Sequence, residues 1–296
     1  MEDVPHTKDF AIVLGGSQGL GLATVRKLLM EGIPVIAIHR DMRKDMRQID
    51  VEFDSLSRGS TPFYTIHKDA LKEKGQVEIL REIKKILGQG AKVRLLVHSI
   101  AKGNLKPMTS DSQAPTLSEA DFKLTGEAMA YNMYSWVKLL FREGLFTANP
   151  GVIAFTSEGS SKVIPGYGAV AAAKATLEAI IRQIAVEFAP WGLRANGLQA
   201  GVTPTDSMKR IPGSTEILER TAQRNPLGRL TRPEDIADVV YLLSRPEAEW
   251  INGAIIKVDG GKVCAEMKKE FTEILDQLPY APPFRFVDGL TRLTPE

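Results

Sequence analysis

The sequence of 296 residues contains a single cysteine, Cys264, and four histidines. One cysteine cannot form an internal disulfide or a zinc cluster of several thiolates. We therefore expect a cytoplasmic protein without a metal site. Acidic and basic side chains nearly balance, with 36 Asp and Glu against 38 Lys and Arg, which leaves a net charge of +2. Such a balance disfavours a nucleic-acid-binding surface, although local basic patches are still compatible with it.

Long hydrophobic runs are also missing. No stretch approaches the roughly 20 apolar residues that cross a bilayer, so we expect no membrane span. Residues 1–8 lack the basic and then apolar order of a signal peptide. Apolar residues nevertheless make up 43% of the chain. That content is enough for a full core, and the length favours one large domain over two.

A glycine-rich turn follows the first predicted strand. Residues 10–14 form a short apolar run typical of a buried strand, and a helical pattern begins at Leu22. At such a junction, glycines let the backbone approach a pyrophosphate, whose charge is met by free N–H groups and the helix dipole. The turn therefore predicts a dinucleotide-binding site. Its expected cofactor contacts are Gly15, Ser17, Gln18, Gly19, Leu20 and Gly21.

The residues after the second predicted strand, 34–38, bear on which cofactor is used. A carboxylate at this place would bind the free 2′-hydroxyl of the adenosine ribose. Here His39 is followed by Arg40, whose guanidinium can pair with a 2′-phosphate. We predict NADPH rather than NADH. A solvated loop arginine explains Arg40 nearly as well, so NADH stays open.

Other strand ends add predicted cofactor contacts. Asp69 follows the strand predicted over 63–67, where its carboxylate can reach the adenine amino group. The strand predicted over 93–97 runs into small residues that would let nicotinamide lie against the backbone. A further turn follows the sixth strand, 193–198. The contacts expected from these three turns are Asp69, Ala70, Ser99, Ile100, Ala101, Gly201, Val202, Thr203 and Thr205.

An alanine-rich stretch over 167–179 predicts a helix. Tyr167 and Lys174 share a face of this helix, two turns or about 10 Å apart. That spacing suits two groups that hold different parts of one long ligand, such as a reacting carbonyl and the ribose of a cofactor. Taken alone, the stretch fits an ordinary amphipathic helix with a packing tyrosine and a solvated lysine better.

Strand and helix patterns alternate along the whole chain. This alternation predicts an α/β fold, a Rossmann-type, doubly wound, mostly parallel sheet of seven strands in one domain with a C-terminal tail. A helical region over 119–145 carries Asn132 in its middle, either as a packing residue or to hold a water near Lys174. Residues 203–224 are predicted to be a mobile lid.

These motifs, in this order, resemble the short-chain dehydrogenase/reductase family over about residues 8–263. The usual reductases of that family place the tyrosine four residues before the lysine, where this chain has Val170. A tyrosine seven residues before the lysine is similar to the divergent branch of enoyl-[acyl-carrier-protein] reductases. The motifs that carry the resemblance are Gly15-x3-Gly19-x-Gly21, Asp69, Ser157, Lys174, Pro226-Leu227-Gly228-Arg229 and Val258-Asp259-Gly260-Gly261.

The resemblance implies catalytic roles for Tyr167, Lys174 and Ser157. It implies hydride transfer from NADPH to the β-carbon of a trans-2-enoyl thioester in fatty-acid or related acyl-chain synthesis. An acyl carrier protein or another acyl thioester would be the partner. Ser157 stands where enoyl reductases often have tyrosine, so a 3-oxoacyl-thioester or other carbonyl reductase is the alternative. A catalytically idle nucleotide-binding subunit is a third hypothesis.

Two expectations concern assembly. The resemblance implies a homotetramer, and the helix over 167–188 supports it because its apolar face looks wider than one sheet contact needs. That face consists of Leu177, Ile180, Ile181 and Ile184.

We assign residues 1–263 to the reductase domain and 264–296 to the tail. Residues 273–288 resemble the start of a hot-dog-fold hydroxyacyl-carrier-protein dehydratase. The tail is thus either the beginning of a fused domain or an ordinary tail docked at a subunit boundary.

Overall fold

The computed structural model describes residues 9–111, 113–209 and 213–265. Of the predicted tail, only Cys264 and Ala265 fall within these ranges, so the resemblance to a dehydratase lies outside the described residues. The same holds for residues 1–8 and for positions 210–212 of the predicted lid.

Seven strands form one sheet in the order β3-β2-β1-β4-β5-β6-β7. Every neighbouring pair is parallel. The predicted doubly wound, seven-stranded sheet is confirmed, and it is wholly parallel. The strands are β1 Phe10–Leu14, β2 Val35–His39, β3 Phe63–His67, β4 Val93–His98, β5 Phe146–Thr156, β6 Arg194–Ala200 and β7 Ile255–Val258.

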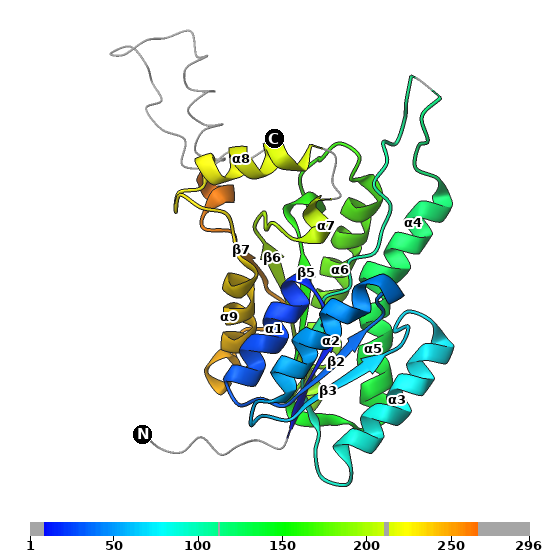
Figure 1. Cartoon of the computed structure of the whole chain (residues 1–296), viewed down its shortest axis with the longest axis vertical. Coiled ribbons are helices and arrows are strands. Elements are labelled where there is room, and N and C mark those ends of the chain that lie inside the picture. Colours follow the sequence, from blue (N-terminus) through cyan, green and yellow to red (C-terminus); the bar gives the residue numbers. More distant parts are fainter. Residues whose placement is uncertain (1–8, 112, 210–212, 266–296) are drawn as a thin grey trace.

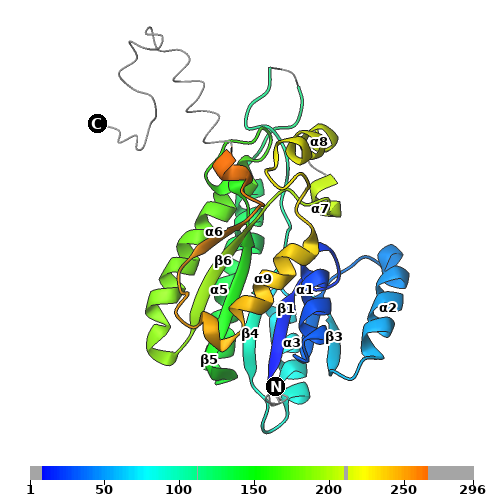
Figure 2. The same ribbon diagram turned by 90° about the vertical axis from the view of Figure 1, so that its left-hand side faces the viewer.

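Helices cover both faces of the sheet, because parallel strands are apolar on both sides and need a cover on each. One apolar cluster joins the sheet to α3, α5 and α6, and the other joins it to α1 and α9. Figure 2 shows α5 and α6 on one side of the sheet and α1 and α9 on the other. The helices are α1 Gly19–Met30, α2 Arg43–Ser57, α3 Glu73–Leu87, α4 Glu119–Gly126, α5 Asn132–Arg142, α6 Gly168–Glu187, α7 Asp206–Lys209, α8 Ser214–Arg224 and α9 Pro233–Leu243.

The strand order reverses between β1 and β4, which pair side by side with Leu14 opposite His98. In open α/β sheets, ligands bind at such a switch point, outside the carboxyl ends of the strands. The loop over 99–118 and the helices α7 and α8 all lie beyond these ends (Figure 1). The fold thus places a loop and two helices at the same edge of the sheet.

The helical region predicted over 119–145 is not one regular helix. α4 ends at Gly126, a π-helical segment runs from Glu127 to Tyr131, and α5 begins at Asn132. A π segment inserts an extra residue into the helical turn and often occurs near functional sites. It changes which side chains face the sheet, and it precedes Asn132 directly.

The apolar face of α6 does not support the predicted tetramer. Leu177, Ile181 and Ile184 are buried in the core of the domain, and Ile180 packs against the same cluster. The sheet and its neighbouring helices therefore use most of this face, and only Ile180 is still partly exposed. The tetramer stays a prediction that rests on the family resemblance.

Among the helices within the described ranges, none is long and apolar enough to cross a membrane.

Candidate functional site

The glycine loop after β1 packs tightly against the end of β4. Gly15 has a φ of +83°, and a Cβ added there would lie 2.7 Å from the carbonyl oxygen of Ser99. A Cβ on Gly21 would lie 2.0 Å from the carbonyl oxygen of Gly15 and 3.0 Å from the Ser99 Oγ. Only glycine fits these positions, because backbone and β4 occupy the space. The fold therefore brings together the predicted contacts from the first and the fourth strand.

The same loop can hold a pyrophosphate. α1 begins at Gly19, and no side chain caps its N-terminus. The first backbone N–H groups of a helix lack intrahelical partners and favour an anion. Thr205, from the turn after β6, stands across from this helix start, since a Cβ on Gly19 would lie 3.4 Å from the Thr205 Cγ2. The residues present thus fit a dinucleotide, with one wall from the glycine loop and another from residues 201–205.

Two predicted adenosine contacts bind each other. The Arg40 Nη1 lies 2.6 Å from the Asp69 Oδ2, and the Arg40 side chain is 55% exposed. Asp69 also accepts a hydrogen bond from the backbone N–H of Leu71 at 3.0 Å. An exposed ion pair is worth little, about 0–1 kcal/mol, because water screens it. Arg40 can therefore leave Asp69 for a stronger anion such as a phosphate at small cost.

Asp41 is a residue of this corner that the sequence analysis missed. Its Oδ2 lies 2.8 Å from the His39 Nδ1, and its Oδ1 accepts a hydrogen bond from the Gln18 amide at 3.2 Å. Burial pushes the pKa of Asp41 up, but hydrogen bonds from His39 and Ser17 outweigh it, and the net pKa is lowered. Both carboxylate oxygens are engaged, so Asp41 ties the end of β2 to the glycine loop.

Tyr167 lies immediately before α6, with a φ of −102° and a ψ of 4°. Its hydroxyl is 3.4 Å from the hydroxyl of Ser157, which follows β5. Burial raises the pKa of Tyr167, the Ser157 hydrogen bond opposes this, and the negative charge of Glu158 adds to the increase. The phenol therefore stays protonated at neutral pH and can donate a hydrogen bond.

Lys174 lies on α6 and is buried, with 8% of its surface exposed. Its Nζ donates a hydrogen bond to the carbonyl oxygen of Phe155 at 2.6 Å. Burial lowers the pKa of Lys174 to about 8, and the negative charge of Glu178 partly offsets the effect. Glu178 in turn accepts a hydrogen bond from the Thr156 hydroxyl at 2.6 Å. An ammonium group has three donors, and the carbonyl of Phe155 fixes where this one sits.

Asn132 forms a link between two strand ends. Its Nδ2 donates to the carbonyl oxygen of Ala70 at 2.9 Å, and its Oδ1 lies 3.3 Å from the Nε2 of His98. Burial lowers the pKa of His98 to about 3, and the positive charge of Lys174 acts in the same direction, against the Asn132 hydrogen bond. His98 is therefore neutral and donates to Asn132. Both ends of the Asn132 amide are engaged by protein groups, which supports the packing hypothesis rather than a water holder.

An apolar wall lies beside Tyr167. Met129, Val170 and Ala173 form a buried cluster against which Leu105 and Tyr167 pack. The sequence analysis missed Leu105, because a single leucine in a polar loop carries no periodic signal. The cluster also explains the position four residues before Lys174, where the Val170 side chain faces apolar neighbours.

One carboxylate fixes Leu105 in this wall. Asp121, on α4, accepts hydrogen bonds from Asn104 and from Lys106, the two residues that flank Leu105. It also accepts from the backbone and side chain of Ser118 at the start of the helix. These bonds hold the pKa of Asp121 well below its usual range. The loop and the first turn of α4 are therefore joined at a single ionised group.

The remaining predicted contacts surround the same edge of the sheet. Thr203 is buried and donates to the carbonyl of Gly201, and Ala70 receives hydrogen bonds from three side chains. Leu20, in the first turn of α1, is partly buried against the core. Ile100 packs against the opposite cluster, and Ala101 is exposed. Of the predicted lid, α7 and α8 are described, and residues 210–212 lie outside the described residues.

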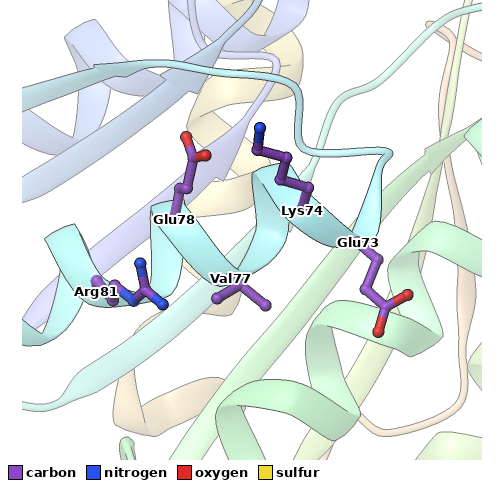
Figure 3. A pocket seen from close by; sticks show the side chains of 5 residues that line it. All are labelled: Glu73, Lys74, Val77, Glu78 and Arg81. Atoms are coloured by element: carbon purple, nitrogen blue, oxygen red, sulfur yellow. The ribbon is translucent and has the colours of Figure 1, made fainter.

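Two other features carry no site. Within the part of the chain that the structure describes, no group of three or more His, Cys, Asp or Glu side chains gathers to bind a metal. A surface hollow lies on α3 (Figure 3), and all its lining residues come from this one helix. Glu78 in this hollow is paired with Lys68. The lining residues are Glu73, Lys74, Val77, Glu78 and Arg81.

Known proteins share this fold and this sequence pattern. Residues 15–262 match the family described as Enoyl-(Acyl carrier protein) reductase. An NADPH-dependent aldehyde reductase-like protein of Arabidopsis thaliana is 27% identical over 88% of this chain and 96% of its own length. The NADH-dependent enoyl-[acyl-carrier-protein] reductase FabI of Aquifex aeolicus is 30% identical over 62% of this chain and 67% of its own length.

Solved structures agree on the architecture. The crystal structure of the Aquifex aeolicus enoyl reductase superposes with a TM-score of 0.74, at 22% identity, over 87% of this chain and 97% of that chain. A short-chain dehydrogenase/reductase from Serratia marcescens superposes with a TM-score of 0.73, at 21% identity, over 87% of this chain and 99% of that chain. At these identities the superpositions establish the fold alone.

Proposed function

The chain belongs to the short-chain dehydrogenase/reductase family, and from this premise we propose that it is an NADPH-dependent enoyl-[acyl-carrier-protein] reductase. The observation that carries the proposal is the position of the phenol. Tyr167 precedes α6 by one residue, seven residues before the buried Lys174, whereas Val170, four before Lys174, lies in an apolar cluster. The hydroxyl available to a substrate is therefore that of Tyr167.

The chemistry assigns separate roles to Tyr167 and Lys174. The bound nicotinamide supplies a hydride to the β-carbon of a trans-2-enoyl thioester. Negative charge then builds up on the thioester oxygen, and the protonated Tyr167 donates a hydrogen bond to that oxygen, as an oxyanion hole does. Lys174, held by the Phe155 carbonyl, directs its other donors to the ribose hydroxyls and keeps a positive charge nearby.

The apolar wall favours an acyl substrate. Leu105, Met129 and Val170 pack beside the Tyr167 ring, and Met108 and Leu117 lie over the start of α6, where a Cβ on Gly168 would be 3.2 Å from the Met108 Sδ. A wall of this kind excludes water from the reacting carbonyl and binds a hydrocarbon chain. We assign the acyl chain to this wall and the acyl carrier protein or its thioester arm to the outer side of α7 and α8.

The cofactor proposal rests on Arg40. Asp41, the carboxylate nearest to the end of β2, already accepts a hydrogen bond on each oxygen, so it is less available to a ribose hydroxyl than an unbound carboxylate would be. Arg40 is exposed and held only by a surface ion pair. A 2′-phosphate would offer the guanidinium a charge-assisted, bidentate partner. NADH is the alternative, in line with the cofactor named for the Aquifex aeolicus relative.

One observation favours a second function. The hydroxyls of Ser157 and Tyr167 lie 3.4 Å apart, an arrangement in which both could donate to a ketone oxygen. A carbonyl reductase acting on a 3-oxoacyl thioester is therefore the alternative. In that case Ser157→Ala should strongly reduce turnover of a ketone and only slightly reduce turnover of an enoyl substrate.

The test is NADPH oxidation with crotonyl and acetoacetyl thioesters, assayed side by side at equal enzyme concentration. We expect turnover of the crotonyl thioester, with a lower kcat/KM for the acetoacetyl thioester. The reverse preference would replace the enoyl proposal by the carbonyl reductase. Cofactor binding without turnover of either substrate would favour the idle nucleotide-binding subunit.

A further inference from the structure

An ion pair involves the turn that packs on the Tyr167 ring, and it has no role in the proposed chemistry. The Glu158 Oε1 lies 2.6 Å from the Lys262 Nζ, and the side chains are only 21% and 9% exposed. Glu158 directly follows Ser157, and Lys262 comes four residues after the end of β7. The pair thus joins the strand that carries the site to the last described segment of the chain, across 104 positions of sequence.

The turn that carries Glu158 touches the Tyr167 ring. Glu158–Ser160 form one 3-10 turn, and a Cβ added to Gly159 would lie 2.7 Å from Cε1 and 2.8 Å from Cδ1 of Tyr167. The turn is therefore packed directly on the phenol. A charge on Glu158 acts on Tyr167 across protein, where screening is weaker than in water.

Lys262 is placed by a buried aspartate. Asp259, after β7, accepts hydrogen bonds from the backbone N–H groups of Gly261 at 2.9 Å and Val263 at 3.1 Å. Its own carbonyl accepts from the Asn225 amide at 2.8 Å. These bonds fix the short turn over 259–263, so the ammonium group has a defined position and is not a loose surface charge.

We propose that Lys262 is a positioning residue of the site, which holds and neutralises the Glu158 carboxylate so that negative charge can develop beside the Tyr167 hydroxyl. The proposal rests on the proposed role of Tyr167 as hydrogen-bond donor. An unpaired carboxylate here would oppose an oxyanion at the substrate oxygen, because like charges repel strongly in a partly buried site. Together the Glu158 carboxylate and the Lys262 ammonium carry no net charge, so the pair opposes the oxyanion much less than a lone carboxylate would.

Other charged residues of the site make contacts of their own. Lys174 binds the Phe155 carbonyl, and Glu178 accepts from Thr156. Lys106, in the loop over 99–118, pairs with Asp121. Lys162 follows the 3-10 turn, and its backbone N–H donates to the Glu158 carbonyl at 2.8 Å. Among the carboxylates, Glu158 is the one whose charge raises the pKa of Tyr167.

The experiment compares Lys262→Met, Glu158→Gln and the double variant on the crotonyl thioester at neutral pH. Lys262→Met leaves the carboxylate uncompensated, and we expect kcat to fall about threefold to tenfold. The double variant removes both charges and should recover most of the wild-type kcat. A purely structural pair would give no such recovery, because the second substitution would add to the damage. Lys262→Arg keeps the charge and should retain activity.

Lys257→Met serves as the matched control, because Lys257 lies on the same terminal segment in β7 with an exposed side chain. It should leave kcat unchanged. A second readout needs no turnover. Tyrosine labelled with a heavy carbon isotope at Cζ reports the titration of Tyr167 by NMR, with the signal assigned through Tyr167→Phe. The pKa of Tyr167 should be lower in Glu158→Gln and higher in Lys262→Met.

Failure of the inference and failure of the proposed function differ. The role of Lys262 would be overturned if the pKa of Tyr167 is the same in all variants, or if kcat of the double variant is no higher than that of Lys262→Met. This holds even if Tyr167→Phe abolishes turnover. Full activity of Tyr167→Phe would overturn the proposed function, and with it the catalytic part of this inference, whatever the titrations show.

Discussion

The two ends of the candidate site are held in place by different means. At the α6 end, Lys174 is buried and bound to the Phe155 carbonyl, and the Tyr167 ring is packed on Gly159. At the adenosine end, Arg40 is 55% exposed and pairs with Asp69 on the surface. Burial fixes the first set, whereas the second can exchange partners for less than about 1 kcal/mol. The reacting end is thus preorganised, and the end that selects the cofactor is adaptable.

This difference predicts that substitutions near Tyr167 act on turnover and that substitutions near Arg40 act on cofactor choice. The largest effect should come from Tyr167→Phe. Its hydroxyl is needed fully only in the transition state, so kcat and kcat/KM for the enoyl thioester should fall together. Loss of one oxyanion donor typically costs about 100- to 1000-fold. NADPH affinity, measured by fluorescence titration, should stay nearly unchanged.

A matched control is Tyr64→Phe, which removes the hydroxyl of a half-exposed tyrosine in β3, at the far edge of the sheet. It should behave as wild type. Wild-type turnover by Tyr167→Phe would mean that another group stabilises the oxyanion, and the rigid end would lose its proposed function.

A second way to test the rigid end is Gly159→Ala. The added Cβ would lie 2.7 Å from the Tyr167 ring, closer than such contacts allow, so the ring must move. Misplacing a catalytic group by about 1 Å can cost about 100-fold, and we expect kcat to fall about 10- to 100-fold. Since the phenol itself is intact, cofactor affinity should be retained.

Gly90→Ala is the control for this substitution, because a Cβ at Gly90 meets nothing within 4 Å. Thermal unfolding of both variants separates a local displacement from a general loss of stability. If Gly159→Ala keeps full kcat while the fold is intact, the ring is not held as tightly as its packing indicates.

The architecture was predictable because its signals are local. Strands β1, β2 and β4 are buried and mostly apolar runs, and Gly15, Gly19 and Gly21 mark the turn after the first of them. The pairs that tune the site are not local. Arg40 and Asp69 are 29 positions apart, and Glu158 and Lys262 are 104 apart. The sequence analysis singled out Arg40 and Asp69 as two separate cofactor contacts and did not single out Glu158 or Lys262. Only the strand order brings the members of each pair together.

The sequence analysis also did not predict the π segment before Asn132, for a different reason. Its sequence, Glu127–Tyr131, carries ordinary helix-forming residues, so no local pattern distinguishes it from regular helix. The inserted residue is stabilised by tertiary contacts, among them the bonds from Asn132 to His98 and to the Ala70 carbonyl. Tertiary packing decides such a feature, and propensity does not.

The adaptable end should respond to Arg40→Ala in cofactor preference. A charge-assisted contact to a 2′-phosphate is worth about 1.5–3 kcal/mol, and release from Asp69 subtracts up to about 1 kcal/mol. We therefore expect kcat/KM for NADPH to fall about tenfold, with little change for NADH. Arg43→Ala, which removes the same charge from the exposed start of α2, should leave the ratio unchanged.

Asp69→Asn changes the same pair from the other side. It frees the guanidinium, so the ratio of kcat/KM for NADPH to that for NADH should rise, while both values fall because an adenine contact is lost. If the wild type uses the two cofactors equally well, with a ratio that neither Arg40→Ala nor Asp69→Asn changes, this corner does not select the cofactor.

The smallest expected effect is a pH dependence at the rigid end. The pKa of Lys174 is lowered to about 8 by burial, so the ammonium form prevails below pH 8 and is lost as the pH rises through it. The Tyr167 phenol has a raised pKa and does not titrate in this range. Because kcat/KM reports groups of the free enzyme, kcat/KM for NADPH should be about half its neutral-pH value near pH 8 and should decline further above it.

Glu178→Gln identifies the group responsible. The Glu178 charge raises the pKa of Lys174 against the effect of burial. Its removal should therefore move the alkaline limb of the pH profile, the decline of kcat/KM for NADPH, to lower pH. Glu187→Gln removes the same charge from the exposed end of α6 and should leave the limb in place. If the alkaline decline of kcat/KM occurs at the same pH in Glu178→Gln, the titration belongs to another group. The preorganised ammonium of Lys174 would then remain charged throughout, and the rigid end would carry no pH dependence of its own.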